Sequence, residues 1–371
     1  MALPAIGRER PVIDDQAMTL RFNPPPAHVC LLRLSAIGDT CHALAALRAL
    51  QAAWPQTRFT WIIGKIEAKL MSALLPEVEF ITFDKGATVR ELRRLRRDLA
   101  PRHFDLLLHM QLSFRASLVS ALVRAPIKLG FDRARARELQ WLFTHEQIPA
   151  RPHQHVLDSL LEFVRACGIE PGAPDWRIQC SPAAQAYARS IIPDQQPTLL
   201  ISPCSSRSVR NWPHQRYAAL ARYAATVHSM RVVLVGGPSA FEAQMGAHIE
   251  ALAGVSLNNT IGKDTLPFLL ALIERATVLL TPDSGPAHMA SMVATPVIGL
   301  YAATNPARSG PYNSLATCVD RYDAACRRYR GKPARMLAWT TKIEEPGVME
   351  LIEVEAVERM LDQVLRQDNV R

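Results

Sequence analysis

Apolar runs of four to eight residues alternate with helical patterns along almost the whole chain. In the N-terminal half the runs fall at 28–34, 59–63, 79–83 and 104–109, and helices are predicted between them, the first over 40–53. Continuous apolar runs separated by helices are typical of parallel strands that are covered on both faces. The pattern therefore predicts an α/β fold.

The alternation weakens between about 180 and 197, where prolines and polar residues gather, and then restarts with strands predicted at 198–202, 231–235, 277–281 and 296–301. Two βαβ domains joined in this way favour a ligand site in the cleft between them. We interpret the chain as a frayed N-terminal arm over 1–26, a Rossmann-like domain over 27–185, a linker over 186–196, a second Rossmann-like domain over 197–350 and a C-terminal helix over 351–371.

Composition narrows the class of protein. The chain has 371 residues, of which 49% are hydrophobic and 21% charged, and this excludes a disordered or fibrous protein. No stretch approaches the roughly 20 apolar residues of a membrane-spanning helix, and residues 1–26 lack the apolar segment of a secretory signal. We therefore expect a cytoplasmic protein. Its seven scattered cysteines contain no Cys-x-x-Cys pair, so neither a disulfide framework nor a zinc site is indicated, and most should be buried apolar groups.

Positive charge is concentrated in one segment. Between Lys85 and Arg137 thirteen Lys and Arg face only four Asp and Glu, which equals the +9 excess of the whole chain. Such a field attracts nucleic acid, anionic lipid or an anionic glycan, although a solvated helix face explains the run 93–97 equally well. Aromatic residues are few in the segment and no nucleic-acid motif is present, so we expect no nucleic-acid partner.

Four loops with candidate chemistry each follow a predicted strand, at the carboxyl end where open α/β sheets bind ligands. The first, over 35–40, contains Gly38, which permits a tight turn, and Asp39 at a helix start. Asp39 is either a helix N-cap or a carboxylate poised to accept a proton. The second, over 202–213, places hydroxyls ahead of Arg207 and Arg210, and is either an anion cradle or a polar loop anchored by Trp212.

The other two loops are rich in small residues. The third is Gly236-Gly237-Pro238, with Glu242 shortly after, and it lacks the dinucleotide-binding pattern. The fourth, over 281–290, leads into a helix whose first turn should hold Pro286 and His288, so that the amides of Ser284 and Gly285 favour a diphosphate. The chain has no Asp-x-Asp for a metal-bound nucleotide sugar and no Gly-x-x-x-x-Gly-Lys-Ser/Thr loop. Diphosphate handling without a metal is the remaining interpretation.

Together these loops resemble glycosyltransferase family nine, the ADP-heptose:lipopolysaccharide heptosyltransferases, over about residues 27–366. The resemblance is carried by Arg33-Leu-Ser-Ala-Ile-Gly-Asp39, by Ser205-Ser206 with Arg210-Asn-Trp-Pro213, by Asp283-Ser-Gly-Pro-Ala-His288, by Gly299-Leu-Tyr301 and by Thr304-Asn-Pro-Ala-Arg308. In the last stretch Ala303 and Asn305 stand where the family more often has Pro and Asp.

The resemblance implies a GT-B architecture, in which two facing Rossmann-like domains with parallel sheets flank a deep cleft. It implies an inverting transfer of heptose from ADP-L-glycero-D-manno-heptose to the lipopolysaccharide inner core (Kdo-lipid A or a heptosylated acceptor), without metal or other cofactor, at the inner face of the inner membrane. Asp39 would be the general base. The donor would be bound by Ser205, Ser206, Arg210, Glu242, Asp283, Ser284, Gly285 and His288, and the anionic lipid-linked acceptor by Gly38, Arg133, Arg135 and Arg137.

Several alternatives stay open at this point. Ala240 or Phe241 fits the family's ribose-binding position as well as Glu242 does. The chain could also be a family relative that uses another nucleotide sugar or acceptor, or a non-catalytic GT-B module that regulates surface polysaccharide synthesis. The combination of Asp39 with Arg210 and the Asp283 loop argues against the last, because a pure binder needs no base.

Overall fold

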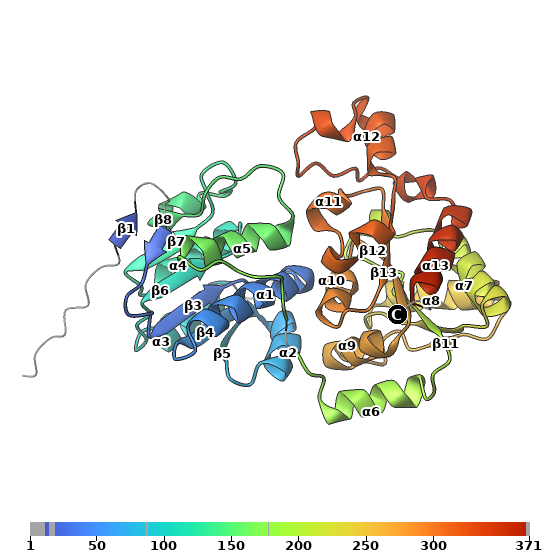
Figure 1. Ribbon diagram of the computed structural model, residues 1–371, viewed down its shortest axis with the longest axis horizontal. Coiled ribbons are helices and arrows are strands. Elements are labelled where there is room, and N and C mark those ends of the chain that lie inside the picture. The colour runs from blue at the N-terminus through green and yellow to red at the C-terminus, as the bar shows by residue number, and fades with distance from the viewer. Residues whose placement is uncertain (1–11, 15–18, 87, 177, 369–371) are drawn as a thin grey trace, which may run out of the picture.

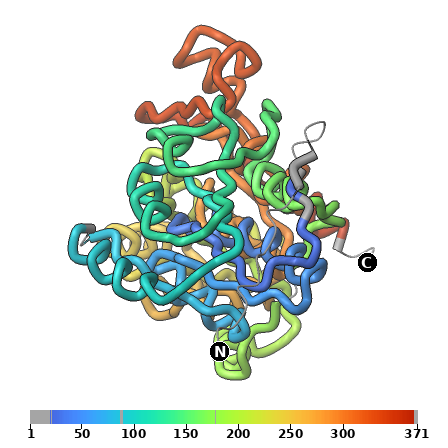
Figure 2. Tube along the Cα trace, turned by 90° about the vertical axis from the view of Figure 1, so that its left-hand side faces the viewer, coloured from blue at the N-terminus to red at the C-terminus, as the bar shows by residue number. Residues whose placement is uncertain are grey.

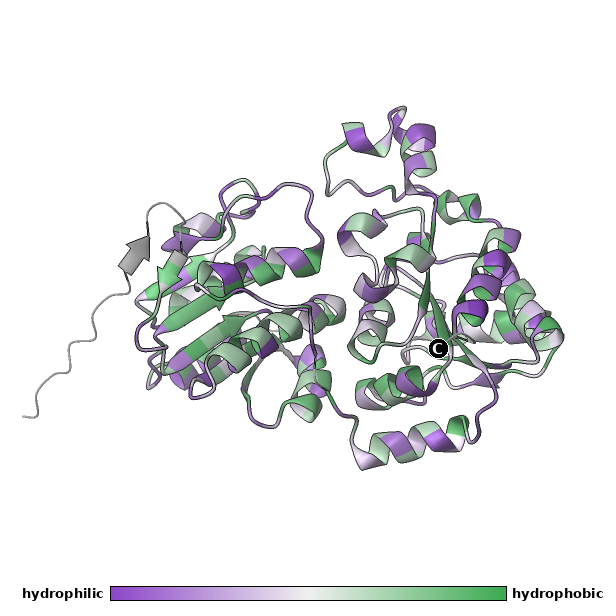
Figure 3. Ribbon diagram, viewed as in Figure 1, coloured by the Kyte–Doolittle hydropathy of each residue, from purple (hydrophilic) through white to green (hydrophobic). Residues whose placement is uncertain are grey.

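The computed structural model describes residues 12–14, 19–86, 88–176 and 178–368, and divides them into two α/β domains that face one another (Figure 1). Each domain has a six-stranded parallel sheet at its centre with helices on both faces. Apolar residues gather on the strands and on the inward faces of the helices, as Figure 3 shows. Both the α/β class and the two Rossmann-like domains are confirmed.

The N-terminal domain contains the strands β3 (His28–Leu32), β4 (Arg58–Gly64), β5 (Glu79–Phe83), β6 (Leu106–His109), β7 (Ile127–Gly130) and β8 (Glu146–Gln147). Their spatial order is β5-β4-β3-β6-β7-β8, and all neighbours are parallel. The helices are α1 (Ile37–Ala53), α2 (Lys65–Leu74), α3 (Thr88–Leu99), α4 (Phe114–Leu122) and α5 (Val156–Ala166). All five residues of β3 are buried, because helices cover both faces of this central strand.

The C-terminal domain repeats this order as β11-β10-β9-β12-β13-β14, again with parallel neighbours. Its strands are β9 (Thr198–Ile201), β10 (Arg231–Leu234), β11 (Asn258–Asn259), β12 (Val278–Pro282), β13 (Val297–Tyr301) and β14 (Cys318–Asp320). Its helices are α7 (His214–Val227), α8 (Ala240–Ala253), α9 (Leu266–Arg275), α10 (Gly285–Met292), α11 (Pro306–Ser309), α12 (Tyr322–Arg330) and α13 (Val354–Asp368). The predicted C-terminal helix is confirmed by α13.

This strand order places a topological switch point in each sheet, between β3 and β6 in one domain and between β9 and β12 in the other. Ligands of open α/β sheets bind outside the carboxyl ends of the strands at such points. The loops after these four strands contain Asp39, Gln111, Arg210 and Asp283. The topology alone therefore brings most of the candidate chemistry to the two facing edges.

Two predicted segments differ from the structure. The arm over 1–26 was expected to be frayed, but β1 (Val12–Asp14) and β2 (Thr19–Arg21) form an antiparallel hairpin, with Leu20 buried and Phe22 packed edge to face on Trp54 at 5.5 Å. Residues 1–11 and 15–18 lie outside the described residues. The predicted linker over 186–196 cuts through helix α6 (Pro182–Ile191), which is capped by Ser181 and packs on α9. The connection between the domains therefore contains a helix, with irregular residues before it and after it.

The domains also meet directly. Helix α1 packs against α10, and a single cluster of buried apolar side chains includes residues of both helices. Farther out, the Nε1 of Trp339 donates to the carbonyl of Gln154 at 2.8 Å, and the hydroxyl of Tyr312 donates to Asp158 at 2.9 Å. The helix packing and the two hydrogen bonds hold the facing loops of the two sheets together.

In the view of Figure 2, which is turned by 90° from Figure 1, the region around α12 projects at the top of the molecule, beyond the rest of the C-terminal domain.

Candidate functional site

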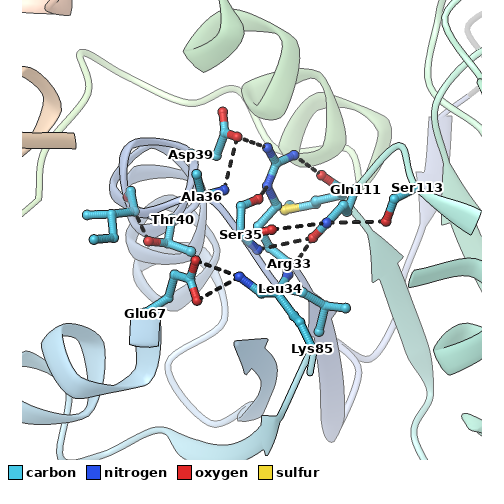
Figure 4. Close-up of polar contacts among 12 residues, drawn as sticks. Arg33, Leu34, Ser35, Ala36, Asp39, Thr40, Glu67, Lys85, Gln111 and Ser113 are labelled. Atoms are coloured by element: carbon cyan, nitrogen blue, oxygen red, sulfur yellow. Dashed lines mark hydrogen bonds and ion pairs between the residues drawn. The ribbon is translucent and has the colours of Figure 1, made fainter. Parts of the chain in front are cut away.

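Asp39 lies at the centre of the site, on the first turn of α1. The helix begins three residues earlier than predicted, after Ala36, so Asp39 is its third residue and not its N-cap. One carboxylate oxygen, Oδ2, accepts a hydrogen bond from the Ala36 amide at 3.2 Å and forms an ion pair with Arg33 (Figure 4). Within the described residues the other oxygen has no hydrogen-bond partner, and 32% of the side chain is exposed. One oxygen is thus held in place while the other is available for a substrate.

Arg33 is the residue that fixes Asp39. It is largely buried at the end of β3, and its Nε donates to the carbonyl of Ser35 at 2.9 Å while Nη1 donates to the carbonyl of Met110. Burial favours the protonated form of Asp39, but the charge of Arg33 and the Ala36 amide outweigh it and hold the pKa of Asp39 below its usual value. Asp39 is therefore a charged carboxylate at neutral pH, as a general base requires.

Gln111, in the loop after β6, supports the backbone of the same loop. Its Oε1 accepts from the amides of Leu34 at 2.5 Å and Ser35 at 3.2 Å, and its Nε2 donates to the hydroxyls of Ser35 and Ser113 (Figure 4). A partly buried backbone amide without a partner is costly. Gln111 removes that cost and links the two loops at the switch point.

A cavity of about 670 Å³ opens beside Asp39, between the domains. Most of its wall comes from the N-terminal domain, and Arg308, Trp339 and Thr340 complete it from the C-terminal domain. Its charged wall residues are Arg33, Asp39, Arg135, Arg137, Arg151 and Arg308, together with His153. The arrangement suits an anionic molecule that presents a hydroxyl to Asp39.

The residues predicted for the acceptor separate into two groups. Arg135 and Arg137 line the cavity. Arg133 does not, because it is exposed and lies over the ring of Trp141, 4.7 Å from the ring centre. Gly38 is also absent from the cavity wall, since it is buried against His288. Two of the four residues predicted to contact the acceptor thus line the cavity, and for Arg133 and Gly38 that contact stays a prediction.

The loop after β9 contains Ser205, Ser206 and Arg210. Ser205 closes the loop on itself, with its hydroxyl donating to the carbonyl of Arg207 at 2.8 Å, and Ser206 is exposed. Arg210 is largely buried, with its guanidinium 3.5 Å from Asp283 and 2.8 Å from Glu344. Trp212 is fully buried with its Nε1 bonded to the carbonyl of Ile352, so it anchors the loop as expected. Arg210 and Asp283 are therefore brought together from two neighbouring strands.

The loop after β12 leads into α10 as predicted, with Ser284 as the N-cap and Pro286 in the first turn. The Ser284 side chain makes no capping bond, because its hydroxyl is engaged with Thr281 at 2.7 Å. The first amides of α10 are therefore left for a ligand, at the positive end of the helix. His288 lies in this first turn and is buried, and burial lowers its pKa, so the ring is neutral at neutral pH.

Glu242 makes local hydrogen bonds at the start of α8, and the donor contact that the resemblance implies for it stays a prediction. It is the third residue of α8, and its carboxylate accepts from the Gly237 amide and the Ser239 hydroxyl, while its own amide donates to Ser239 at 3.2 Å. Ser239 thus caps α8, and the Glu242 carboxylate holds the Gly237–Ser239 turn in place. Nearby, burial first and then the charge of Glu242 raise the pKa of Asp264 to about 7.

The first turns of α1 and α10, which contain Asp39 and His288, touch across the domain interface. A Cβ added to Gly38 would lie 2.2 Å from Cδ2 of His288, and one added to Gly285 would lie 3.4 Å from the side chain of Ile37. Only glycine permits the first approach. Asp39 is thereby held next to the start of α10, where the donor diphosphate is expected.

The sequence predicts no role for Gln111 or Arg308, and Arg33 is predicted only as part of a motif. Arg308 was within a quoted stretch, but nothing in its spacing shows that α11 turns it toward Asp39. Gln111 follows the predicted strand over 104–109. If that strand had been placed next to β3, the switch point between the two strands would have identified Gln111 as a candidate site residue. Among the described residues there is no group of three or more His, Cys, Asp or Glu placed to hold a metal ion. The helices of the same residues include none that is both long and apolar enough to cross a bilayer.

Comparisons with known proteins agree with this geometry. Residues 92–339 match the family described as glycosyltransferase family 9 (heptosyltransferase). The chain is 40% identical over 336 residues to the lipopolysaccharide core heptosyltransferase OpsX of Haemophilus influenzae, covering 91% of this chain and 96% of that protein. It is 20% identical to two solved structures: a family 9 glycosyltransferase of Veillonella parvula (TM-score 0.75; 92% and 97% of the chains covered) and the Escherichia coli heptosyltransferase WaaC with ADP (TM-score 0.71; 91% and 99%). The structural likeness shows the fold, which is the predicted GT-B arrangement.

Proposed function

We propose, from the premise that this chain belongs to glycosyltransferase family 9, the heptosyltransferases, that it transfers heptose from ADP-L-glycero-D-manno-heptose to the lipopolysaccharide inner core with inversion at the anomeric carbon. The enzyme is a heptosyltransferase of lipopolysaccharide core biosynthesis. The observation that carries the inverting mechanism is the charged Asp39, which has one oxygen fixed by Arg33 and the other open to an arginine-lined cavity.

In this mechanism the acceptor lies in the cavity and presents a hydroxyl to the open oxygen of Asp39. The hydroxyl oxygen attacks the anomeric carbon from the face opposite the leaving ADP, its proton passes to Asp39, and the bond from the anomeric carbon to the diphosphate oxygen breaks. A single displacement of this kind inverts the anomeric configuration. General-base assistance contributes about 10²–10⁴ in rate.

The leaving diphosphate gains negative charge as the bond breaks. Arg210 and the first amides of α10 are the groups that would compensate this negative charge. Arg210 would release Glu344 and bind phosphate oxygens in its place. The amides would act through the positive end of the helix dipole. Such prearranged charge is often the largest catalytic contribution. It supports transfer without a metal, as the sequence predicts.

The enzyme would work at the cytoplasmic face of the inner membrane, where a lipid-linked acceptor is accessible. Two features of the N-terminal domain support contact with an anionic membrane surface. Helix α3 exposes Arg90, Arg93, Arg96 and Arg97, and the apolar side chains of Phe114, Leu139 and Leu142 are 45–58% exposed. Each arginine near an anionic surface contributes roughly 1 kcal/mol.

The substitution Asp39→Asn tests the mechanism. It keeps the size of the side chain and its bond with the Ala36 amide, so ADP affinity should stay within about threefold, while kcat should fall about 10²–10⁴-fold. The matched control is Glu170→Gln. It removes an acid that is largely exposed and does not line the cavity. If the Asp39→Asn enzyme keeps more than a tenth of the wild-type kcat, Asp39 is not the base.

A further inference from the structure

The arginines of the cavity wall differ in whether an acid neutralises them. Three are paired: Arg33 with Asp39, Arg135 with Asp132, and Arg151 with Glu162 at 3.2 Å. Arg137 and Arg308 form no ion pair among the described residues. The cavity therefore contains two arginines that no acid of the described residues pairs directly.

These two arginines come from opposite domains. Arg137 lies between β7 and β8 of the N-terminal domain, and its Nη2 donates to the hydroxyl of Thr340, across the cleft, at 2.9 Å. Arg308 lies on α11 of the C-terminal domain, and no hydrogen bond of its side chain is formed with the described residues. Burial lowers the pKa of Arg308, and the neighbouring charges of Arg137 and Arg33 lower it further, against the opposing effect of Asp39 and Asp283. Two like charges facing one partly enclosed cavity are unfavourable unless an anion lies between them.

We propose that Arg137 and Arg308 form a two-domain anion site that binds a carboxylate or phosphate group of the acceptor and so presents the acceptor hydroxyl to Asp39. This rests on the proposed function. A guanidinium offers two parallel N–H donors to either kind of oxyanion, which fixes the orientation of the bound sugar as well as its position. The site is separate from the donor cradle, because Arg210 pairs with Asp283 and Glu344 and does not line the cavity.

The position of the site couples acceptor binding to the closed arrangement of the domains. An anion bound by both arginines adds a further link to those that already join the domains, among them Arg137 with Thr340 and Trp339 with Gln154. An acceptor without the anionic group would lose this link. The enzyme should therefore discriminate by charge at a position remote from the reacting hydroxyl.

Steady-state kinetics on the full-length enzyme test the proposal. The variants are Arg137→Ala, Arg308→Ala, Arg308→Lys and the double alanine variant. Arg327→Ala is the control, because it removes an arginine that is paired with Asp323 at 2.7 Å and does not line the cavity. The acceptors are heptose-free lipopolysaccharide core fragments in four forms: native, with carboxylates esterified, with phosphates removed, and with both changes.

Loss of either arginine should raise the KM for the native acceptor about tenfold or more, with kcat/KM falling and ADP affinity unchanged. The KM of Arg308→Lys should lie between those of the wild type and Arg308→Ala, because lysine keeps the positive charge but lacks the two parallel N–H donors of arginine. The alanine variants should no longer distinguish the native acceptor from one neutralised form. Whether esterification or phosphate removal reproduces the effect identifies the anion as carboxylate or phosphate.

Three results would overturn the proposal. They are an unchanged KM in both alanine variants, an equal loss in Arg327→Ala, and a loss of ADP affinity in Arg308→Ala, which would assign Arg308 to the donor. Binding of the native and neutralised fragments is also measured calorimetrically with ADP present and no sugar donor. If the wild-type enzyme fails to transfer heptose, the proposed function fails, but this binding comparison still decides the anion site. Equal melting temperatures of the variants and the wild type show that a loss is not unfolding.

Discussion

The close approach of Gly38 to His288 makes a single methyl group a sensitive probe of the site. In Gly38→Ala the new Cβ would lie 2.2 Å from Cδ2 of His288 and 3.0 Å from Cγ and Nε2. Carbon atoms in contact are ordinarily about 3.5 Å apart or more, so the ring or the helix that carries it must move by roughly 1 Å.

The ring has little room to move away. His288 is 8% exposed, and its ring packs edge to face on His42, whose ring centre is 4.6 Å away and which is 2% exposed. We therefore expect α1 and α10 to separate slightly, which moves Asp39 away from the donor loop. A misplacement of about 1 Å can cost about 10² in rate, whereas overpacking of this kind destabilises a fold by only about 1–3 kcal/mol.

The assay compares kcat, ADP affinity and melting temperature for Gly38→Ala with those for Gly172→Ala. A Cβ at Gly172 meets no atom within 4 Å, so that control should behave as wild type. Gly38→Ala should lose about two orders of magnitude in kcat, lose less than threefold in ADP affinity, and remain folded at the assay temperature. A folded Gly38→Ala enzyme with kcat within threefold of wild type would refute the reasoning that this contact sets the distance between base and donor.

Three further predictions concern ADP binding, the pH dependence of stability and the need for a metal. Arg210→Ala should weaken ADP binding about 10–100-fold by calorimetry, the range for one charge-assisted hydrogen bond, and unchanged affinity would remove Arg210 from the diphosphate cradle. Asp264→Asn should stabilise the fold above about pH 7 by roughly 1–3 kcal/mol but hardly at pH 4. The pKa of Asp264 is raised to about 7 in the folded protein. Between about pH 4 and pH 7 the unfolded chain therefore releases a proton that the folded chain keeps, so the wild-type free energy of unfolding falls as the pH rises. Denaturant unfolding that gives the same difference between variant and wild type at every pH would contradict this. Excess EDTA should leave both ADP binding and transfer unchanged, and a loss that Mg²⁺ restores would contradict transfer without a metal.

The fold could be predicted from the sequence because the central strands are continuous apolar runs. The apolar run 28–34 corresponds to β3. The runs 59–63, 198–202 and 277–281 correspond equally clearly to β4, β9 and β12. The edge strands β8 and β11 were missed, since each has only two residues and no period can be recognised over that length. Helix α6 was missed for another reason: prolines at 182 and 193 suggested a linker, although Pro182 occupies the first turn, where proline is tolerated.

The site could be predicted only in part. Asp39, Arg210, Asp283 and His288 were expected because each follows a strand in a small-residue loop, and the structure brings them to the facing edges of the two sheets. Gly38 was expected to contact the acceptor, whereas its packing against His288 depends on which residue faces it from the other domain, and a sequence does not give that. The same holds for Arg308, whose importance arises from α11 facing the cavity of the other domain.

The most direct test of the account is the anomeric configuration of the product. The wild-type enzyme is incubated with ADP-heptose of defined anomer and a heptose-free lipopolysaccharide core acceptor, and the one-bond carbon–proton coupling at the new anomeric centre is measured by NMR. We expect a heptosylated product with the anomeric configuration opposite to that of the donor, formed at least 10²-fold more slowly by Asp39→Asn. A product that retains the donor configuration, or no heptosylated product from an enzyme that binds ADP, would contradict the account.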